Sequence, residues 1–245
     1  MWFYKILFFG LILSGFQQVR ADTVQINPSA DVQVYVASQS YNDTSYQMNV
    51  GQYANGYNLH YYVGLASWTG VDLSTLAGQS SSTLRLYVQD FLTPDLSNGG
   101  GATSIPSLSS SSTGNFTLKV VALSGTPNPA NMNDAWVKTN MIDAAGVGSV
   151  TLTSSGYNTV NIGSTVANWI SAGTGSRWLG FVGTGSSSAY NSVKLGTLEP
   201  YRDFEGTVIS PAAPMYLTIP EPSVSGLFGS ALFYYWMVRR KRSSL

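Results

Sequence analysis

The chain has 245 residues, no cysteine and a formal net charge of zero, and only 10% of its residues are charged. Six of the 12 basic residues lie in the first 21 and last 26 residues, whereas 11 of the 12 acidic residues lie between them, so this body carries a net charge of −5. The charge argues against a nucleic-acid-binding protein, and the lack of cysteine excludes disulfides and thiolate metal sites.

Residues 1–21 are typical of a secretory signal peptide. Lys5 supplies the positive charge, an apolar run follows over 6–16, and the small-x-small sequence Val-Arg-Ala at 19–21 predicts cleavage before Asp22. The alternative is an uncleaved N-terminal anchor. We therefore expect an exported protein, in which residues 22–219 form one domain.

The body reads as a series of short strands. In residues 83–89, Leu84 and Leu86 share one face and Arg85 and Tyr87 share the other, which is the period-two pattern of a strand. The same pattern, in places weaker, occurs in 31–37, 47–51, 59–65, 115–123, 150–153, 159–162, 178–182, 192–195 and 215–219. Many short strands separated by turn residues predict an all-β fold, a β-sandwich.

One short helix is predicted near the middle of the body. Apolar residues recur at helical spacing over 166–170, Ser164 or Thr165 can cap the N-terminus, and Gly173 can end the helix. We expect Trp169, within this helix, and Trp136, outside it, to lie in the core.

Tyrosines are concentrated between residues 41 and 62. Tyr53 and Tyr57 flank an Asn-Gly turn at 55–56, and Tyr61 and Tyr62 follow. A tyrosine ring can stack on the C–H face of a sugar while its hydroxyl makes hydrogen bonds, so these four residues are the candidate carbohydrate-binding residues. The alternative is cross-strand aromatic packing.

Catalysis finds little support in the sequence. His60 is the only histidine, and no Gly-x-Ser-x-Gly elbow is present for a serine nucleophile. Asp203 and Glu205 would share one face of a strand as paired carboxylates, but their segment reads better as a solvated turn. We expect a protein that is not an enzyme.

The last 26 residues have three parts. Pro220, Glu221 and Pro222 form a stiff extended turn, and an apolar stretch over 224–238 follows. As a helix, that stretch rises only about 22 Å, short of the roughly 30 Å hydrocarbon core. Four basic residues close the chain and favour a cytoplasmic end: Arg239, Arg240, Lys241 and Arg242.

This tail, 220–245, resembles the PEP-CTERM sorting signal of Gram-negative bacteria, with its Pro-Glu-Pro motif, short transmembrane helix and basic end in the same order. The resemblance implies that an exosortase recognises and removes the tail. The protein would be held in the inner membrane transiently and then reach the outer surface or the extracellular matrix. An ordinary C-terminal anchor is the alternative.

The order of strand sequences in the body resembles the DNRLRE-type β-sandwich of surface proteins. Matching pieces include SADVQVYV, STLRLYV, NTVNIGSTVANWI and MYLTI, in that order. The resemblance implies a jelly-roll-like module that binds carbohydrate or associates with the matrix. It also implies, by position in the family, that Asp31 and Glu199 hold a structural Ca²⁺; simple capping or solvation of these carboxylates is the alternative.

Taken together, these patterns predict an exported β-sandwich that binds extracellular polysaccharide without catalysis. Two alternatives remain open: a structural matrix or adhesin protein that has no glycan site, and a polysaccharide hydrolase or lyase.

Overall fold

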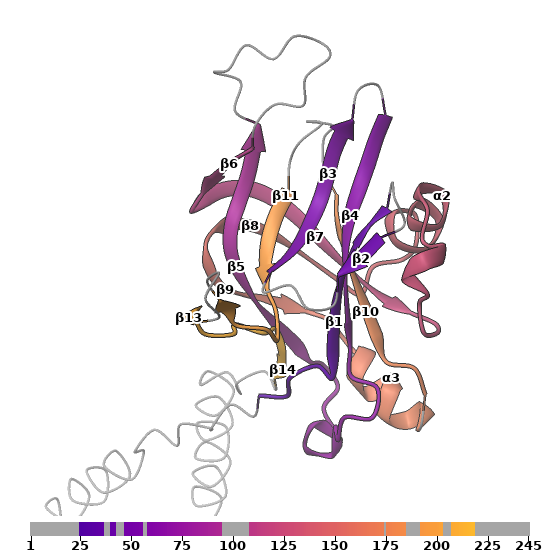
Figure 1. Ribbon diagram of the computed structural model, residues 1–245. Helices are drawn as coiled ribbons and strands as arrows, with labels where there is room; N and C mark the ends of the chain where they lie inside the picture. The colour runs from indigo at the N-terminus through magenta and orange to yellow at the C-terminus, as the bar shows by residue number, and fades with distance from the viewer. Residues whose placement is uncertain are drawn as a thin grey trace, which may run out of the picture. The chain divides into compact units, whose positions relative to one another are not determined.

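A computed structural model describes residues 25–36, 40–42, 47–55, 58–94, 108–173, 175–184, 192–202 and 207–218, all within one compact unit, Val24–Ile219 (Figure 1). The predicted signal peptide and sorting tail, with its transmembrane helix, lie outside the described residues. Within those residues no helix is long and apolar enough to cross a membrane.

The described unit is mostly β-strand. The strands are β1 (Ala30–Tyr35), β2 (Ser40–Asn42), β3 (Gln47–Asn55), β4 (Asn58–Ser67), β5 (Thr83–Pro94), β6 (Leu108–Ser111), β7 (Thr113–Leu123), β8 (Gly148–Ser154), β9 (Gly156–Asn161), β10 (Trp178–Gly183), β11 (Ser192–Gly196), β12 (Tyr201–Arg202), β13 (Val208–Ser210) and β14 (Tyr216–Thr218). The helical segments are the 3-10 turns η2 (Ser74–Leu76) and η4 (Pro129–Asn131), the α-helices α2 (Asp134–Val137) and α3 (Thr165–Ala172), and the π-helix η5 (Lys138–Ile142).

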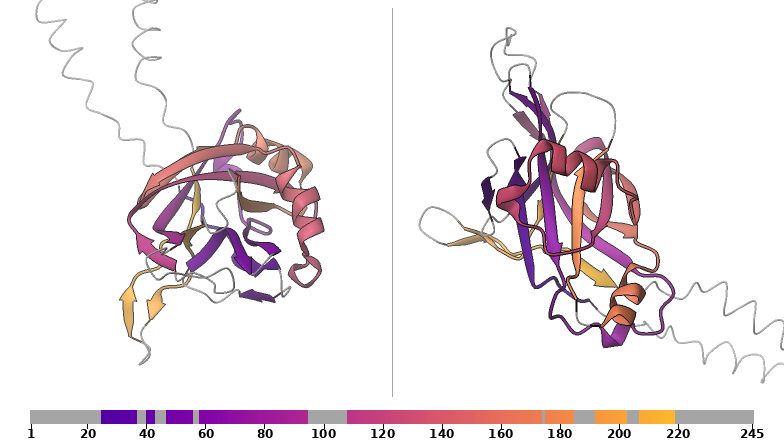
Figure 2. Two further views of the ribbon diagram at one scale, coloured as in Figure 1. Left: turned by 90° about the horizontal axis from the view of Figure 1, so that it is seen from above. Right: turned by 90° about the vertical axis from the view of Figure 1, so that its right-hand side faces the viewer.

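The main sheet is antiparallel and curled, with the strand order β14-β5-β11-β3-β4-β10-β7-β8. The strand β4 lies at the centre of the curled sheet, because it pairs with three other strands. Its Tyr62 pairs with Tyr35 of β1 and with Gly51 of β3, and its Leu65 pairs with Gly180 of β10. Seen from above, the strands surround an interior, and the β12–β13 hairpin stands away from it (Figure 2, left). The first half of the curled sheet, as we use the term, comprises β14, β5, β9, β11 and β3, and the second half comprises β1, β4, β10, β7 and β8.

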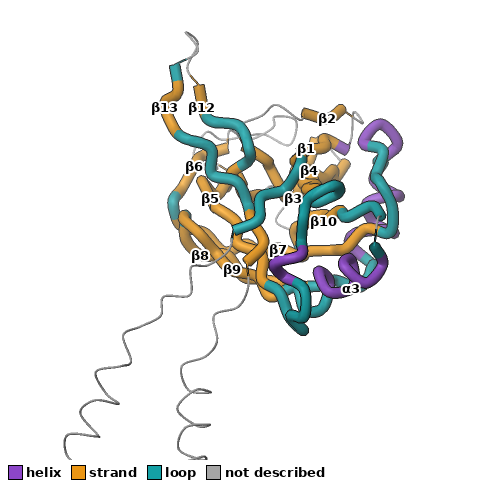
Figure 3. Tube along the Cα trace, turned by 90° about the horizontal axis from the view of Figure 1, so that it is seen from below, coloured by secondary structure: helices purple, strands orange, loops and turns teal. Residues whose placement is uncertain are grey.

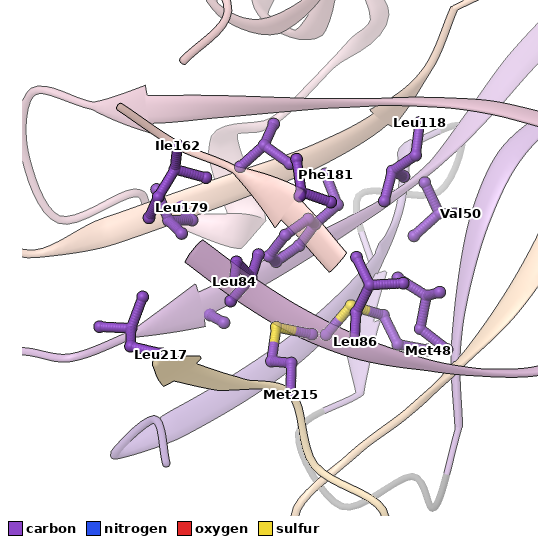
Figure 4. Packing of buried hydrophobic residues seen from close by; sticks show 14 of the residues in the cluster. Met48, Val50, Leu84, Leu86, Leu118, Ile162, Leu179, Phe181, Met215 and Leu217 are labelled. Carbon is purple, nitrogen blue, oxygen red and sulfur yellow. The ribbon is translucent and has the colours of Figure 1, made fainter. Parts of the chain in front are cut away.

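The interior holds the larger core, which we call the inner core. Alternate residues of β5 point into it, among them Leu84 and Leu86, and they meet Leu118 of β7 and Phe181 of β10 from the second half (Figure 4). These four side chains are fully buried, and burying each is worth roughly 1.5–3 kcal/mol. The alternation predicted for 83–89 and 115–123 is confirmed.

A second cluster, the outer core, lies on the other face of the second half. Val32 and Val34 of β1 contribute to it, which confirms the shared face predicted for 31–37. The α2–η5 segment covers this face, and Met141 of η5 fits over Gly180, where an added Cβ would lie 2.6 Å from the Met141 Cε atom. In Figure 3 the short helical segments, in purple, lie mainly to one side of the orange strands.

The sequence did not predict the α2–η5 segment. With four α-helical and five π-helical residues, it is too short to show an amphipathic repeat. Trp136 and Trp169, both predicted in the core, are half-buried; Trp136 packs against the outer core and Trp169 against the inner core.

The predicted helix is confirmed as α3, and Gly173 follows it with a φ of 75°. The predicted cap differs. Ser164 occupies the N-cap position but its side chain makes no capping bond, and the Thr165 hydroxyl instead donates to the Ile162 carbonyl at 2.6 Å.

Candidate functional site

The four predicted tyrosines do not all fall within the described side chains. Those of Tyr53 and Tyr57 lie outside them. Tyr61 and Tyr62 are successive, half-buried residues of β4, so their side chains project to opposite faces of the sheet. Tyr61 packs against the outer core, whereas Tyr62 stacks on Tyr35 with ring centroids 5.1 Å apart. Burial raises the pKa of Tyr62, and Tyr35 adds to this rise.

A different group of aromatic residues gathers on the outward face of the first half. We call it the tyrosine–arginine surface, and it consists of Arg85, Tyr87, Tyr157 and Tyr216. The strand register places Tyr87 of β5 opposite Tyr157 of β9, and Arg85 of β5 opposite Tyr216 of β14. Three strands distant in sequence therefore build one surface.

The strand period explains why these side chains face outward. Leu84, Leu86 and Val88 of β5 point into the inner core, so Arg85 and Tyr87 point away from it. On β9, Val160 likewise points inward, which leaves Tyr157 on the outside. The surface thus follows from the same alternation that builds the core.

The rings and the guanidinium lie within contact of one another. The rings of Tyr87 and Tyr157 meet edge to face at 5.1 Å, and those of Tyr157 and Tyr216 lie 5.6 Å apart. The Arg85 guanidinium carbon lies 5.3 Å from the Tyr157 ring centroid and 5.9 Å from that of Tyr216, which is cation–π geometry. These contacts hold the side chains in place before any ligand arrives.

Exposure differs across the surface. Tyr216 is 5% exposed and forms its floor, whereas Tyr157 is 45% exposed. Burial raises the pKa of Tyr157, and the neighbouring Tyr216 adds to the rise while Arg85 opposes it. The Arg85 Nε atom is buried and has no hydrogen-bond partner in the described part of the chain. The surface therefore offers aromatic faces, phenol hydroxyls and a guanidinium group, a combination suited to sugar rings.

Asp31 and Glu199, the predicted calcium ligands, do lie together. Asp31 is 4% exposed, and its Oδ2 atom accepts a 2.8 Å hydrogen bond from the backbone N–H of Leu198. Its carboxyl also hydrogen-bonds that of Glu199, whose Oε2 atom is buried without a partner among the described residues. The pKa of Asp31 is raised from 3.8 to about 7. Burial is the main cause; the hydrogen bond from Leu198 opposes the rise, and the neighbouring Glu199 carboxylate adds to it.

The Asp31–Glu199 pair is explained by a proton that the two carboxyl groups share. Two carboxyl groups in contact cannot both be ionised at low cost, so one retains a proton. Calcium needs six to eight oxygen ligands, and the described residues contain no group of three or more acidic, histidine or cysteine side chains that could hold a metal. The structure thus places the two residues together, and the calcium site stays a prediction.

The residues considered for catalysis are not assembled into a described site. The side chains of His60, Asp203 and Glu205 lie outside the described residues. Comparison with known proteins finds no matching family model and no matching curated protein.

Proposed function

We propose that the protein is an exported, non-catalytic polysaccharide-binding protein, whose curled sheet is a jelly-roll-like β-sandwich. The tyrosine–arginine surface is the observation that carries this proposal. Tyr87 and Tyr157 supply ring faces for the C–H surface of sugars, and Arg85 supplies hydrogen-bond donors beside them. The resemblance of the sequence to the DNRLRE-type module supports the same ligand class.

A polymer suits this surface better than a small molecule does. The surface spans three neighbouring strands, which cover about 10 Å at the usual strand spacing of about 4.8 Å. Its residues lie on a sheet face, along which a chain of sugar units can extend. Sorting of the protein to the cell surface or matrix by an exosortase, as the tail implies, would bring the surface into contact with exopolysaccharide.

The test is binding of the purified protein to a polysaccharide array, followed by two matched variants. Tyr157→Ala should weaken binding about fivefold or more, because a stacked aromatic ring contributes on the order of 1 kcal/mol beyond its area. Val208→Ala is the control, since Val208 is also 45% exposed but belongs to β13. Val208→Ala should unfold at the wild-type temperature, and Tyr157→Ala should unfold at a slightly lower one because it loses the ring contacts with Tyr87 and Tyr216. Both proteins should be fully folded at the temperature of the assay.

The outcomes separate the proposal from its alternatives. If no polysaccharide is retained, the protein belongs to the structural matrix or adhesin class. If Tyr157→Ala binds as well as Val208→Ala, the tyrosine–arginine surface is not the site. Release of new reducing or unsaturated sugar ends during the assay would indicate a hydrolase or lyase.

A further inference from the structure

A groove of about 560 Å³ lies beside the second half of the curled sheet, between the end of β7 and the α2–η5 segment. Its lining comes from β7, the turn over 124–128, η4, α2 and η5. Figure 2, right, shows the helical segment lying across the strands of this half. The volume lies within the roughly 300–1,000 Å³ that is usual for ligand sites.

Local hydrogen bonds hold both walls. The Asn128 Oδ1 atom accepts from the Ala130 N–H at 3.1 Å and so caps η4, and Asn133 caps α2 by accepting from the Trp136 N–H at 2.9 Å. On the far side, Lys119 of β7 donates to the Ile142 carbonyl at 2.7 Å. The groove is therefore formed without a ligand.

The walls also contain the π-helix η5, in which the Asp143 N–H donates to the Lys138 carbonyl at 2.8 Å. This wider turn contributes Thr139 and Asn140 to the lining. Single π-helical turns occur frequently at functional sites.

The lining includes one aromatic residue, Trp136, and three amides, Asn128, Asn131 and Asn140, and none of the described residues that line it carries a charge. Trp136 is half-buried against the outer core. The Asn128 carbonyl oxygen is used in its cap, which leaves the amino group as a donor; the Asn140 amino group donates to the Trp136 carbonyl at 2.9 Å, which leaves the amide oxygen as an acceptor. The groove thus presents a donor, an acceptor and an indole ring.

We propose that this groove binds an uncharged sugar unit, stacked on Trp136 and hydrogen-bonded by Asn128 and Asn140. A sugar has an apolar C–H face and hydroxyls that both donate and accept, which matches this lining. An anionic ligand would find no cation in the groove, and an apolar ligand would leave the amides without partners. The site is separate from the tyrosine–arginine surface, and either can fail without the other.

The test is calorimetric titration of the full chain, purified in detergent, with neutral hexasaccharides of glucose, mannose and galactose. All measurements use the Tyr157→Ala background, which weakens binding at the tyrosine–arginine surface. Thr139→Arg, added to this background, should lower the affinity at least tenfold. Its long side chain fills the groove from an exposed position, so the unfolding temperature should stay unchanged.

The matched control is Lys138→Ala in the same background, because Lys138 is the exposed neighbour of Thr139 and does not line the groove. It should bind the neutral hexasaccharide as the background does. The proposal is overturned if the background binds none of the three hexasaccharides, if Thr139→Arg leaves binding unchanged, or if Lys138→Ala weakens it equally. A third result is that Thr139→Arg lowers hexasaccharide affinity while Tyr157→Ala leaves binding to the array unchanged. That result would support the groove as a sugar site and rule out the tyrosine–arginine surface as one.

Discussion

Asp31 is a buried carboxyl whose pKa in the folded protein differs strongly from its value in water. Its side chain and that of Gln33 project from the same face of β1, and they reach Leu198 and Asn49 through hydrogen bonds of 2.8 and 2.6 Å. These bonds join β1 to the turn after β11 and to β3, so the two halves are linked by polar contacts along this edge. Burial of Asp31 next to Glu199 makes the link sensitive to pH.

The sign of this dependence follows from the raised pKa. Asp31 ordinarily titrates at 3.8, and in the folded protein its pKa is about 7, so the folded state holds a proton that the unfolded state has lost. The resulting stabilisation is complete below pH 3.8 and is lost as the pH rises through 7. A shift of this size corresponds to at most about 4 kcal/mol.

We therefore predict that Asp31→Asn stabilises the protein at pH 8 and removes the fall in stability between pH 4 and 7. Asparagine keeps an acceptor for the Leu198 N–H and can donate to Glu199. Denaturant titrations of both proteins at pH 4 to 9 measure this difference. Asp72→Asn is the control, because Asp72 is exposed and its pKa is lowered by hydrogen bonds from Ser74.

Equal stability of wild type and Asp31→Asn at pH 8 would contradict the shared proton. Calcium provides a second readout at that pH. If Ca²⁺ raises the unfolding temperature of the wild type and not that of Asp31→Asn, the calcium prediction gains the ligand that the resemblance implies.

Site residues were harder to predict than core residues. The pairing of Asp31 with Glu199 was expected from the resemblance, and the structure places them in contact. The tyrosine–arginine surface was not expected, although the period-two pattern of residues 83–89 already placed Arg85 and Tyr87 on one face. What the sequence lacked was the strand register, which brings Tyr157 and Tyr216 to that face.

At the scale of elements, most strands were predictable, whereas the short strands β2, β6, β12 and β13 and the helical cover of the outer core were not. Alternation is a local signal that each strand carries in its own residues. The α2–η5 segment is stabilised instead by contacts distant in sequence, such as Met141 against Gly180. Its position against β7 and β10 depends on Lys119 and Gly180, and neither residue type indicates a helix in the sequence.

Lys119 of β7 holds the C-terminal end of the α2–η5 segment against the sheet. Its ammonium group donates to the carbonyls of Ile142 and Ala144, at the end of η5, where the last carbonyls of a helix have no N–H partners within the helix. Lys119→Met should keep much of the aliphatic packing, remove both bonds, and lower the free energy of unfolding by about 1–3 kcal/mol. Urea denaturation measures the change, with Lys138→Met as the exposed control.

Because η5 contributes to the lining of the groove, the two Lys119 bonds also support one wall of the groove. Lys119→Met should accordingly weaken neutral-sugar binding while leaving binding at the tyrosine–arginine surface unchanged. A Lys119→Met protein as stable as Lys138→Met would show that the two carbonyl bonds contribute little to holding η5 in place.

At the scale of the whole molecule, strand content was predictable and strand order was not. The all-β class follows from many short alternating segments. The order depends on pairings between distant residues, such as Leu84 with Val160 and with Leu217 on the two sides of β5. Pairings of this range are selected by global packing, so no single window of the sequence specifies them.

The two proposed ligand surfaces lie on different halves of the curled sheet. The first half presents the tyrosine–arginine surface on its outward face, and the second half carries the groove beside α2–η5. One chain with two separate sugar sites would gain avidity for a polymer without further contacts, provided that both sites engage the same matrix. Such bivalent attachment would suit the function that we propose, in which the ligand would hold the protein in place after its release from the membrane.

The last prediction concerns that release. The apolar stretch over 224–238 is shorter than an ordinary membrane span and contains glycine and serine, as suits a temporary anchor. Pro220, Glu221 and Pro222 precede it and would lie just outside the bilayer, with the backbone fixed by the prolines for recognition. Replacing all three with alanine should leave export intact and trap the full-length protein in the inner membrane.

Cell fractionation measures this with an antibody against residues 24–219 and an epitope placed after Arg242. Wild-type protein at the surface or in the matrix should keep the body and lose the epitope, whereas the triple-alanine variant should keep both in the inner membrane. Replacing Ser243 and Ser244 with alanine is the control and should be processed normally, because these residues follow the basic end. Wild-type protein that retains the epitope at its final location would make the tail an ordinary anchor, since only removal of the tail separates a sorting signal from a permanent membrane span.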